Sequence, residues 1–196
     1  MKNRILISKA LMLLVIAIAF LSHHPYDDNT LLDIALEIFG YLFLISAAMG
    51  RTWVSAYISG RKNQVLVTEG PYSVVRNPLY FFSFLGFIGA GLAFESFVIT
   101  LLLGFIFFFT HWKTILDEET QLRRMFGEQF DEYAQTTPRF IPKTWKLRNP
   151  STVSFSPKVF SRAAFDSFFI ALIFSLTHII EWTHVNSVVP ILFYLP

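Results

Sequence analysis

The sequence predicts an all-α fold, a multi-pass transmembrane helical bundle of about five spans with its amino terminus in the cytoplasm. Three observations support this prediction: the composition, five apolar segments and a one-sided distribution of basic residues. Hydrophobic residues make up 54% of the 196 residues, and the mean hydropathy is +0.50. A soluble domain of this size could not bury so much apolar surface, so lipid must cover part of it.

Each of the five apolar segments is close to the ~20 residues that cross a bilayer as a helix. The segments are residues 5–21, 31–49, 79–94, 97–112 and 163–180. Only Glu95-Ser96 separates the third from the fourth, so these two should form a tight antiparallel hairpin. Residues 185–196 are apolar but short and interrupted by Pro190, which favours an interfacial tail and leaves a partial sixth span open.

The first segment also has features of a secretory signal peptide. Lys2 and Arg4 precede the apolar run, and Ala17 and Ala19 have the spacing of a cleavage site. The run is long for a signal peptide and the next span follows closely, so we expect a retained first helix.

The basic residues predict the orientation, because cytoplasmic loops are enriched in Lys and Arg. All sixteen lie in residues 2–9, 51–76 or 113–162, and none lies in residues 22–30, at the 95–96 hairpin or after residue 180. In a five-span arrangement the three basic segments share one side of the membrane. We therefore expect a multi-pass protein of a prokaryotic cytoplasmic membrane, with its site facing the cytoplasm.

The segment LVTEGPYSVVRNPLY (66–80) lies between the second and third spans. Gly70 and Pro71 indicate a turn. Pro78 suits the first turn of a helix, and Asn77 before it is a good helix cap. Part of the segment is thus explained by turn and capping chemistry alone.

That explanation does not cover Tyr72, Arg76 and Tyr80, which converge near the positive end of a membrane helix. Such an end favours an anionic group such as a ligand carboxylate. The segment is therefore either a simple turn with a capped helix or part of a binding site.

A second polar segment, residues 111–142, follows the fourth span. One helical face is formed by Ile115, Glu118, Leu122 and Met125. A carboxylate on this apolar stripe needs a partner, which could be the hydroxyls or ammonium of a ligand, or an arginine such as Arg76.

Other residues of this segment have simpler explanations. Glu119 lies four residues before Arg123, which predicts a surface ion pair. The helix should end near Gln135, and TPRFIP (137–142) should then be extended. Arg139 in this stretch could face either a lipid phosphate or a ligand carboxylate.

Several site classes are not expected. The sequence has no cysteine, and its five histidines are not spaced as metal ligands, so no metal site is predicted. The net charge of +2 is too small to indicate a nucleic-acid partner. Nucleotide-binding glycine loops and a nucleophile elbow are also missing from the sequence.

Residues 66–80, the hairpin of spans and residues 117–142, in this order, resemble the isoprenylcysteine carboxyl methyltransferase and phospholipid N-methyltransferase superfamily. Its members are multi-span membrane enzymes that use S-adenosylmethionine (SAM). The resemblance covers roughly residues 50–142. The matching residues are Gly70-Pro71-Tyr72, Arg76, Pro78, Tyr80, Gly86, Glu118-Glu119, Phe126-Gly127, Tyr133 and Pro138.

The resemblance implies a SAM-dependent methyltransferase core at residues 51–142. Two transmembrane helices (1–50) precede it, and a linker, the last span and an apolar tail (143–196) follow. The implied cofactor-binding residues are Gln64, Val65, Leu66, Val67, Tyr72, Arg76, Asn77, Pro78, Leu79, Tyr80 and Glu118. Glu119 and Arg139 are candidate substrate-binding residues, and the resemblance identifies no catalytic residue.

Asn77 departs from the family pattern, which usually has histidine at this place. Asparagine can cap a helix and donate a hydrogen bond, but it cannot carry a proton near pH 7. We therefore expect the asparagine to affect cofactor affinity more directly than any other property.

The resemblance implies a lipophilic acceptor, which could be an isoprenylcysteine-like carboxylate, a phospholipid amine or a thiol. Membrane lipids would be the other partners. Methyl transfer needs alignment and exclusion of water more than acid–base groups, which agrees with a site without a triad or metal. One alternative is an NADPH-dependent sterol-type reductase, whose variant pattern has Asn where Leu79 stands. Another is a non-catalytic membrane protein that keeps the fold.

Overall fold

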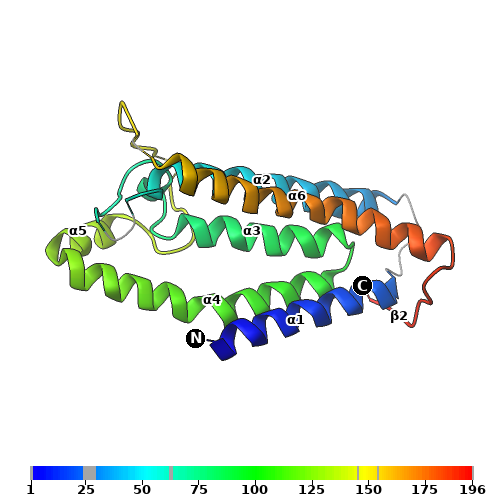
Figure 1. Ribbon diagram of the computed structural model, residues 1–196. Coiled ribbons are helices and arrows are strands. Elements are labelled where there is room, and N and C mark those ends of the chain that lie inside the picture. The colour runs from blue at the N-terminus through cyan, green and yellow to red at the C-terminus, as the bar shows by residue number, and fades with distance from the viewer. Residues whose placement is uncertain (1, 24–29, 62–63, 145, 154, 196) are drawn as a thin grey trace. The chain divides into compact units, whose positions relative to one another are not determined.

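The computed structural model describes residues 2–23, 30–61, 64–144, 146–153 and 155–195, with the backbone alone for residues 2–10, 12, 171 and 174. Figure 1 shows the elements that these residues form. The α-helices are α1 (Lys2–Leu21), α2 (Leu31–Ile58), α3 (Pro78–Ala93), α4 (Phe97–Phe126), α5 (Glu128–Thr136) and α6 (Pro157–Val185). A 3-10 helix η1 (Gly70–Ser73) and the short strands β1 (Ser22–His23) and β2 (Phe193–Tyr194) complete the elements. The predicted all-α fold is confirmed, and each predicted apolar segment lies in a helix except for the last residue of the third, Phe94.

Three of the described helices, α2, α4 and α6, are long and apolar enough to cross a membrane. The apolar helix α3 is shorter, with 16 residues. Only 22% of the most apolar stretch of α2 and 19% of that of α6 is buried within the structure, so lipid must cover the rest. The chain is therefore an integral membrane protein.

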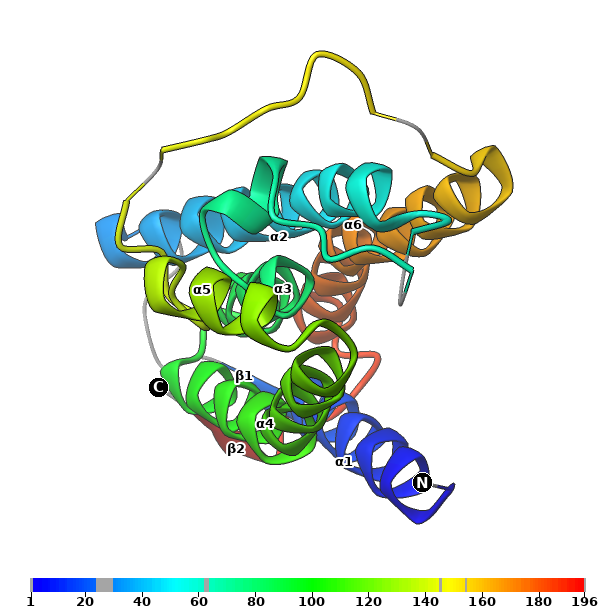
Figure 2. The ribbon, with the colours of Figure 1, turned by 90° about the vertical axis from the view of Figure 1, so that its left-hand side faces the viewer.

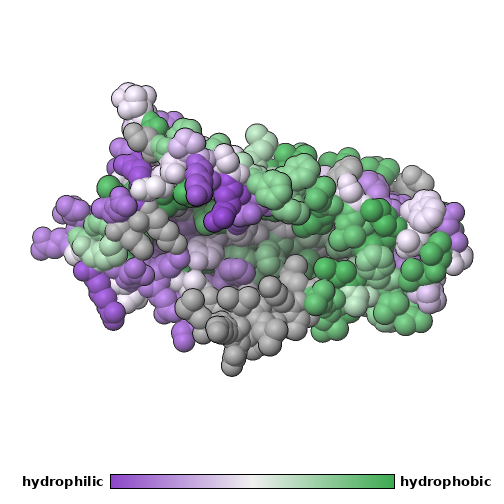
Figure 3. Space-filling model, in the orientation of Figure 1, coloured by the Kyte–Doolittle hydropathy of each residue, from purple (hydrophilic) through white to green (hydrophobic). Residues whose placement is uncertain are grey.

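The structure divides into two compact units. Unit 1 consists of Met1–Ser46, Phe84–Thr110 and Ile170–Pro196, and unit 2 consists of Ala47–Ser83 and His111–Phe169. In Figure 3, apolar side chains dominate the visible surface of unit 1, while polar side chains gather around α5 in unit 2.

The turn between α3 and α4 belongs to unit 1 and confirms the predicted hairpin. Glu95 has a positive φ of 54°, which reverses the chain within three residues. The Ser96 hydroxyl accepts the N–H of Ile99 at 3.2 Å and so caps α4. A Cβ atom on Gly91 would lie 2.3 Å from the Cα of Thr100, so only glycine allows the two helices to come this close.

The carboxyl-terminal segment of unit 1, which we expect to be an interfacial tail, contains a short strand. Strand β2 pairs in parallel with β1, with Phe193 opposite Ser22. Hydrogen bonds extend the pairing on both sides, from the N–H of Leu192 to Leu21 O at 2.8 Å and from the N–H of Leu195 to His23 O at 2.9 Å. Described residues 186–195 contain no helix, so the partial sixth span left open above is not a helical one.

Two glycines allow close packing around α2 in unit 2. A Cβ atom on Gly50 would lie 2.1 Å from the ring of Phe82, so α2 and α3 approach closely at this point. Gly70 has a φ of 58°, and a Cβ atom there would lie 2.3 Å from the ring of Tyr57. The 3-10 helix η1 therefore packs directly on the end of α2.

The helix predicted to run to Gln135 is divided in two. Gly127 has a φ of 53°, which ends α4 at Phe126, and α5 begins one residue later. An ion pair of 2.6 Å between Arg123 and Asp131 spans the break. The α5 helix ends at Thr136, close to the predicted end.

The connection between α5 and α6 is bound to the rest of unit 2, although its composition is that of a linker. Figure 2 shows it passing over the end of α2. Arg148 O accepts the N–H of Gly70 at 2.8 Å. The hydroxyl of Tyr57 donates to Asn149 Oδ1 at 3.2 Å. These bonds hold η1 and the end of α2 together.

Candidate functional site

Unit 2 contains a pocket of about 450 Å³. Its walls come from the end of α2, the extended segment after it, η1, the start of α3, the second half of α4 and α5. Of the eleven residues predicted to bind a cofactor, all but Gln64 line it: Val65, Leu66, Val67, Tyr72, Arg76, Asn77, Pro78, Leu79, Tyr80 and Glu118. Three separate stretches of sequence therefore converge on one cavity.

Seven further residues line the pocket and were not among the predicted ones. They are Arg51, Ile58, Ser83, His111, Gln121, Leu122 and Tyr133. Three of them had a signal in the sequence: Leu122 lies on the apolar stripe with Glu118, Tyr133 is among the residues that match the family pattern, and Ser83 shares a helical face with Tyr80.

Tyr72 and Tyr133 form a polar contact at one wall. The hydroxyl of Tyr133 donates to Tyr72 O at 2.7 Å. Burial is the main cause that raises the pKa of Tyr72, and the neighbouring Glu118 raises it further. Burial likewise raises the pKa of Tyr133. Both phenols therefore remain neutral hydrogen-bond donors across the physiological pH range.

Tyr80 and Glu118 face the same cavity from α3 and α4. The ring of Tyr80 meets the ring of His111 edge to face, with centroids 6.0 Å apart. Glu118 lines the pocket in agreement with its place on the apolar stripe of α4. The pocket thus combines an aromatic face with a carboxylate.

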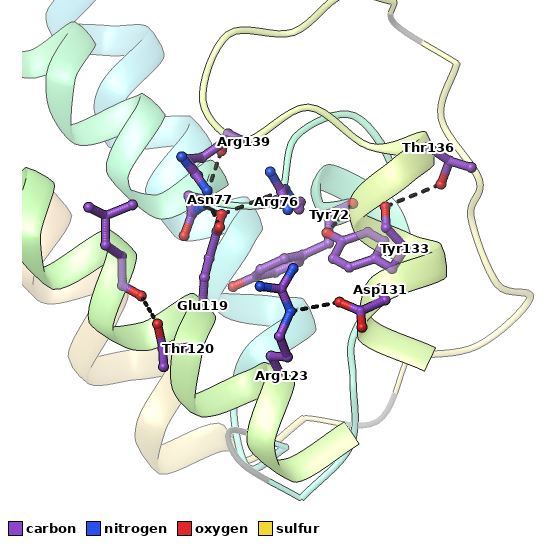
Figure 4. A network of polar contacts seen from close by, with 11 residues as sticks. Tyr72, Arg76, Asn77, Glu119, Thr120, Arg123, Asp131, Tyr133, Thr136 and Arg139 are labelled. Carbon is purple, nitrogen blue, oxygen red and sulfur yellow. Dashed lines mark hydrogen bonds and ion pairs between the residues drawn. The ribbon is translucent and has the colours of Figure 1, made fainter. Parts of the chain in front are cut away.

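The buried carboxylate of α4 is Glu119, which is 7% exposed (Figure 4). Its Oε2 accepts the Nε–H of Arg139 at 2.9 Å, and its Oε1 lies 3.6 Å from Nε of Arg76. The predicted surface pair of Glu119 with Arg123 is wrong, because Arg123 pairs with Asp131. The physical reason is helical spacing: Glu119 lies four residues after the fully buried Ile115 and shares its face.

Asn77 connects this network to the start of α3. Its carbonyl accepts the N–H of Phe81 at 3.0 Å, as expected of a residue that begins a helix. Its side-chain amide donates to Glu119 Oε1 at 2.8 Å and to Arg139 O at 3.1 Å. Glu119 and Arg139 do not line the pocket but hold Asn77 and Arg76, which do.

Residues 31–129, half of the chain, match the phospholipid methyltransferase family. The chain belongs to this family. The match includes α2, α3, α4 and the segment between them, and thus nearly all of the pocket. The superfamily predicted from residues 66–80 and 117–142 is confirmed.

The chain is also similar to named proteins of other organisms, over 51% to 85% of its own length. The chain is 39% identical over 153 residues to the nickel-cobalt-cadmium resistance protein NccN of Alcaligenes xylosoxydans xylosoxydans, covering 78% of this chain and 71% of that protein. It is 36% identical over 166 residues to the cobalt-zinc-cadmium resistance protein CzcN of Cupriavidus metallidurans, covering 85% of this chain and 76% of that protein. It is 33% identical over 104 residues to the protein-S-isoprenylcysteine O-methyltransferase of Schizosaccharomyces pombe, covering 51% of this chain and 44% of that protein. No solved structure matches the chain.

Substitutions of Asn77 test the polar network around Glu119 directly. Asn77→Asp replaces a donor by a second carboxylate beside Glu119, so it should lower the free energy of unfolding by about 1–3 kcal/mol. Asn77→His keeps an N–H donor and should stay near the wild type. Thermal unfolding of the detergent-purified variants measures both. Equal stability of the Asp and His variants would show that the contact with Glu119 does not stabilise the protein.

Proposed function

We propose that the chain is a SAM-dependent methyltransferase that transfers a methyl group to a lipophilic acceptor in the membrane, with the pocket of unit 2 as its cofactor site. The observation that carries the proposal is the convergence of ten predicted cofactor residues on one cavity. Its volume of about 450 Å³ lies in the range of small-molecule sites.

The residues of the pocket fit the chemical parts of this cofactor. The backbone N–H groups at the start of α3 and Arg76 beside them suit a carboxylate. The faces of Tyr72 and Tyr80 suit a sulfonium cation. Glu118 can accept hydrogen bonds from ribose hydroxyls or from an ammonium group.

SAM supplies an electrophilic methyl group when it is bound. The task of the protein is then to align the acceptor with that group and to keep water out. The buried phenols of Tyr72 and Tyr133 suit this task, because they are neutral and do not compete as nucleophiles. A carboxylate acceptor would need no acid–base group from the other lining residues, whereas an amine or thiol acceptor would have to give up a proton.

We further propose that the site faces the cytoplasm of a prokaryotic cell. The pocket is built from residues 51–83 and 111–133, which lie in the segments that hold most of the basic residues. Cytoplasmic segments are enriched in such residues. Partners would be membrane lipids and the acceptor, and nucleic acid is not expected.

Two of the relatives are named as metal resistance proteins. This chain has no cysteine, and its described residues contain no group of three or more His, Asp or Glu side chains that could hold a metal ion. If the proposed activity is correct, any part that this chain takes in metal resistance would be exerted through methylation of a membrane component.

Binding of radiolabelled SAM to the detergent-purified protein tests the cofactor site. Glu118→Ala and Tyr80→Ala should each weaken binding about tenfold or more, because each removes a polar or aromatic contact from the pocket wall. Glu128→Ala is a matched control, since Glu128 is exposed on α5 and does not line the pocket. Wild-type affinity in both pocket variants would rule out the assignment.

Thermal unfolding with added SAM or NADPH separates the alternative functions. SAM should raise the melting temperature of the wild type and NADPH should not. Stabilisation by NADPH alone would favour a sterol-type reductase. If neither compound had an effect at millimolar concentration, a non-catalytic membrane protein would be the better explanation.

A further inference from the structure

The connection after α5 and the first turns of α6 form one basic segment, residues 141–162, which we call the basic strap. It contains no acidic residue and five basic ones, none of which lines the pocket: Lys143, Lys146, Arg148, Lys158 and Arg162. We propose that the basic strap binds the anionic phospholipid headgroups of the membrane surface and thereby stabilises the η1 wall of the pocket. The lipid bound there acts as an effector and is not methylated, so the inference does not depend on the proposed methyl transfer.

The positive charge of the basic strap is not neutralised within the protein. All five basic side chains are exposed. In the part of the chain that the structure describes, none of them forms an ion pair with a carboxylate. Like charges within a segment that lacks acidic residues repel one another, so a partner of opposite charge is favoured. The phosphate groups of anionic phospholipids supply such charge at a membrane surface.

Exposed apolar side chains alternate with these cations along the strap. Each is 45–72% exposed, and they are Ile141, Leu147, Phe155 and Val159. Such side chains enter the boundary between headgroups and acyl chains while neighbouring cations bind the phosphates. A nucleic acid or a free phosphate ion offers aliphatic side chains no comparable environment. The mixture of charge and apolar surface therefore favours a lipid surface as the partner.

The strap is held beside the ends of two candidate membrane spans. The α6 helix begins at Pro157, inside the strap, so its first turns lie where the chain leaves the bilayer. Lys158 and Arg162 are four residues apart and share a face of α6, and long basic side chains at such an end reach the headgroups. The hydroxyl of Ser59, the residue after α2, donates to Ser156 O at 3.0 Å. The strap thus has the place as well as the charge to contact headgroups.

The backbone of the strap holds both ends of η1, whereas its charged side chains stay exposed. Arg148 O accepts the N–H of Gly70 at 2.8 Å, and the N–H of Arg148 donates to the Ser73 hydroxyl at 3.0 Å. Gly70 and Ser73 are the first and last residues of η1, and Tyr72 between them lines the pocket. Lipid that immobilises the strap should therefore also reduce the opening of η1.

Hydrogen–deuterium exchange of the full-length protein in lipid nanodiscs tests this inference. One set of nanodiscs contains phosphatidylcholine alone, and the other contains about one third phosphatidylglycerol. Neither lipid has an amine that could still be methylated. The amides of Gly70 and Arg148 report on the contact between the strap and η1. With phosphatidylglycerol they should exchange about fivefold or more slowly, and high salt should abolish the difference.

Variants then assign the effect to the strap. Lys146→Gln with Lys158→Gln should abolish most of the slowing, because two exposed cations of the strap are removed. Lys113→Gln with Arg124→Gln, both exposed on α4, is the matched control, since it lowers the net charge equally and should behave as the wild type. Leu147→Ser should reduce the slowing in part, because it removes an apolar contact with lipid and no charge.

Three results would overturn the inference. One is equal exchange of the two amides in both kinds of nanodisc. Another is an equal loss of the slowing in the control pair on α4, which would assign the effect to net charge alone. The third is the same slowing by inorganic phosphate added to phosphatidylcholine nanodiscs, which would make the ligand a free anion. None of these measurements involves SAM, so the inference and the proposed function fail separately.

Discussion

Glu119→Ala is expected to lower the free energy of unfolding by about 3–5 kcal/mol, the cost of breaking a buried ion pair by removing one partner. Glu119 is 7% exposed and contacts Asn77, Arg76 and Arg139. Without it, the 12% exposed side chain of Arg76 loses its carboxylate partner. Because Asn77 and Arg76 line the pocket, SAM binding should be lost together with stability.

The exposed ion pair of Arg123 with Asp131 provides the matched control. Its side chains are 61% and 48% exposed, so Asp131→Ala should cost only about 1 kcal/mol or less. Thermal unfolding of the detergent-purified variants compares the two. If both substitutions lowered the melting temperature equally, the network around Glu119 would not be the main polar support of unit 2.

Gly70→Ala is the second substitution with a large expected effect, about 2–5 kcal/mol. A φ of 58° costs an alanine about 1–2 kcal/mol. In addition, the new Cβ would lie 2.3 Å from the ring of Tyr57, and such overpacking costs about 1–3 kcal/mol. The strain should displace η1, and with it Tyr72, from the pocket.

Gly127→Ala separates the two causes. Gly127 has a similar φ of 53°, but a Cβ atom there would meet nothing within 4 Å. It should therefore show the backbone cost alone, about 1–2 kcal/mol. Tyr57→Ala should relieve part of the Gly70→Ala effect in the double variant. Equal losses in the two alanine variants, with no relief, would refute the contribution of the clash.

The helices follow from local sequence features, whereas most of the expected cofactor residues came from the resemblance to a known family. Apolar length predicted the five long segments, and Glu95-Ser96 predicted the hairpin. Gly70-Pro71 and Asn77-Pro78 predicted a turn followed by the capped start of a helix. These features depend on residues close together in the chain, so the sequence alone was sufficient to detect them.

The contacts across unit 2 could not be predicted in the same way. Glu118 and Glu119 are adjacent, and their roles depend on how α4 is rotated against its neighbours. The pattern placed Glu118 inward but left Glu119 on the surface, because its partner Arg139 lies 20 residues away. Arg51 likewise gained its place in the pocket only from the packing of α2 on α3.

The network also explains why a neutral asparagine can occupy position 77. The carboxylate of Glu119 already faces two guanidinium groups, those of Arg139 and Arg76. The remaining need is a neutral donor that bridges Glu119 and Arg139 O, which an amide can supply. A positive charge at this position is not required for the contacts seen here.

The parallel pairing of β1 with β2 has a consequence for biosynthesis. Its partners, Ser22 with Phe193 and His23 with Tyr194, are separated by nearly the whole described chain. A ribosome makes the chain from its amino terminus, so β1 must wait until every helix from α2 to α6 has been produced. Pairing over such a distance is an intrinsically late step. Closure of this small sheet therefore follows the synthesis of α6, and until then the N–H and C=O groups of β1 lack their strand partner.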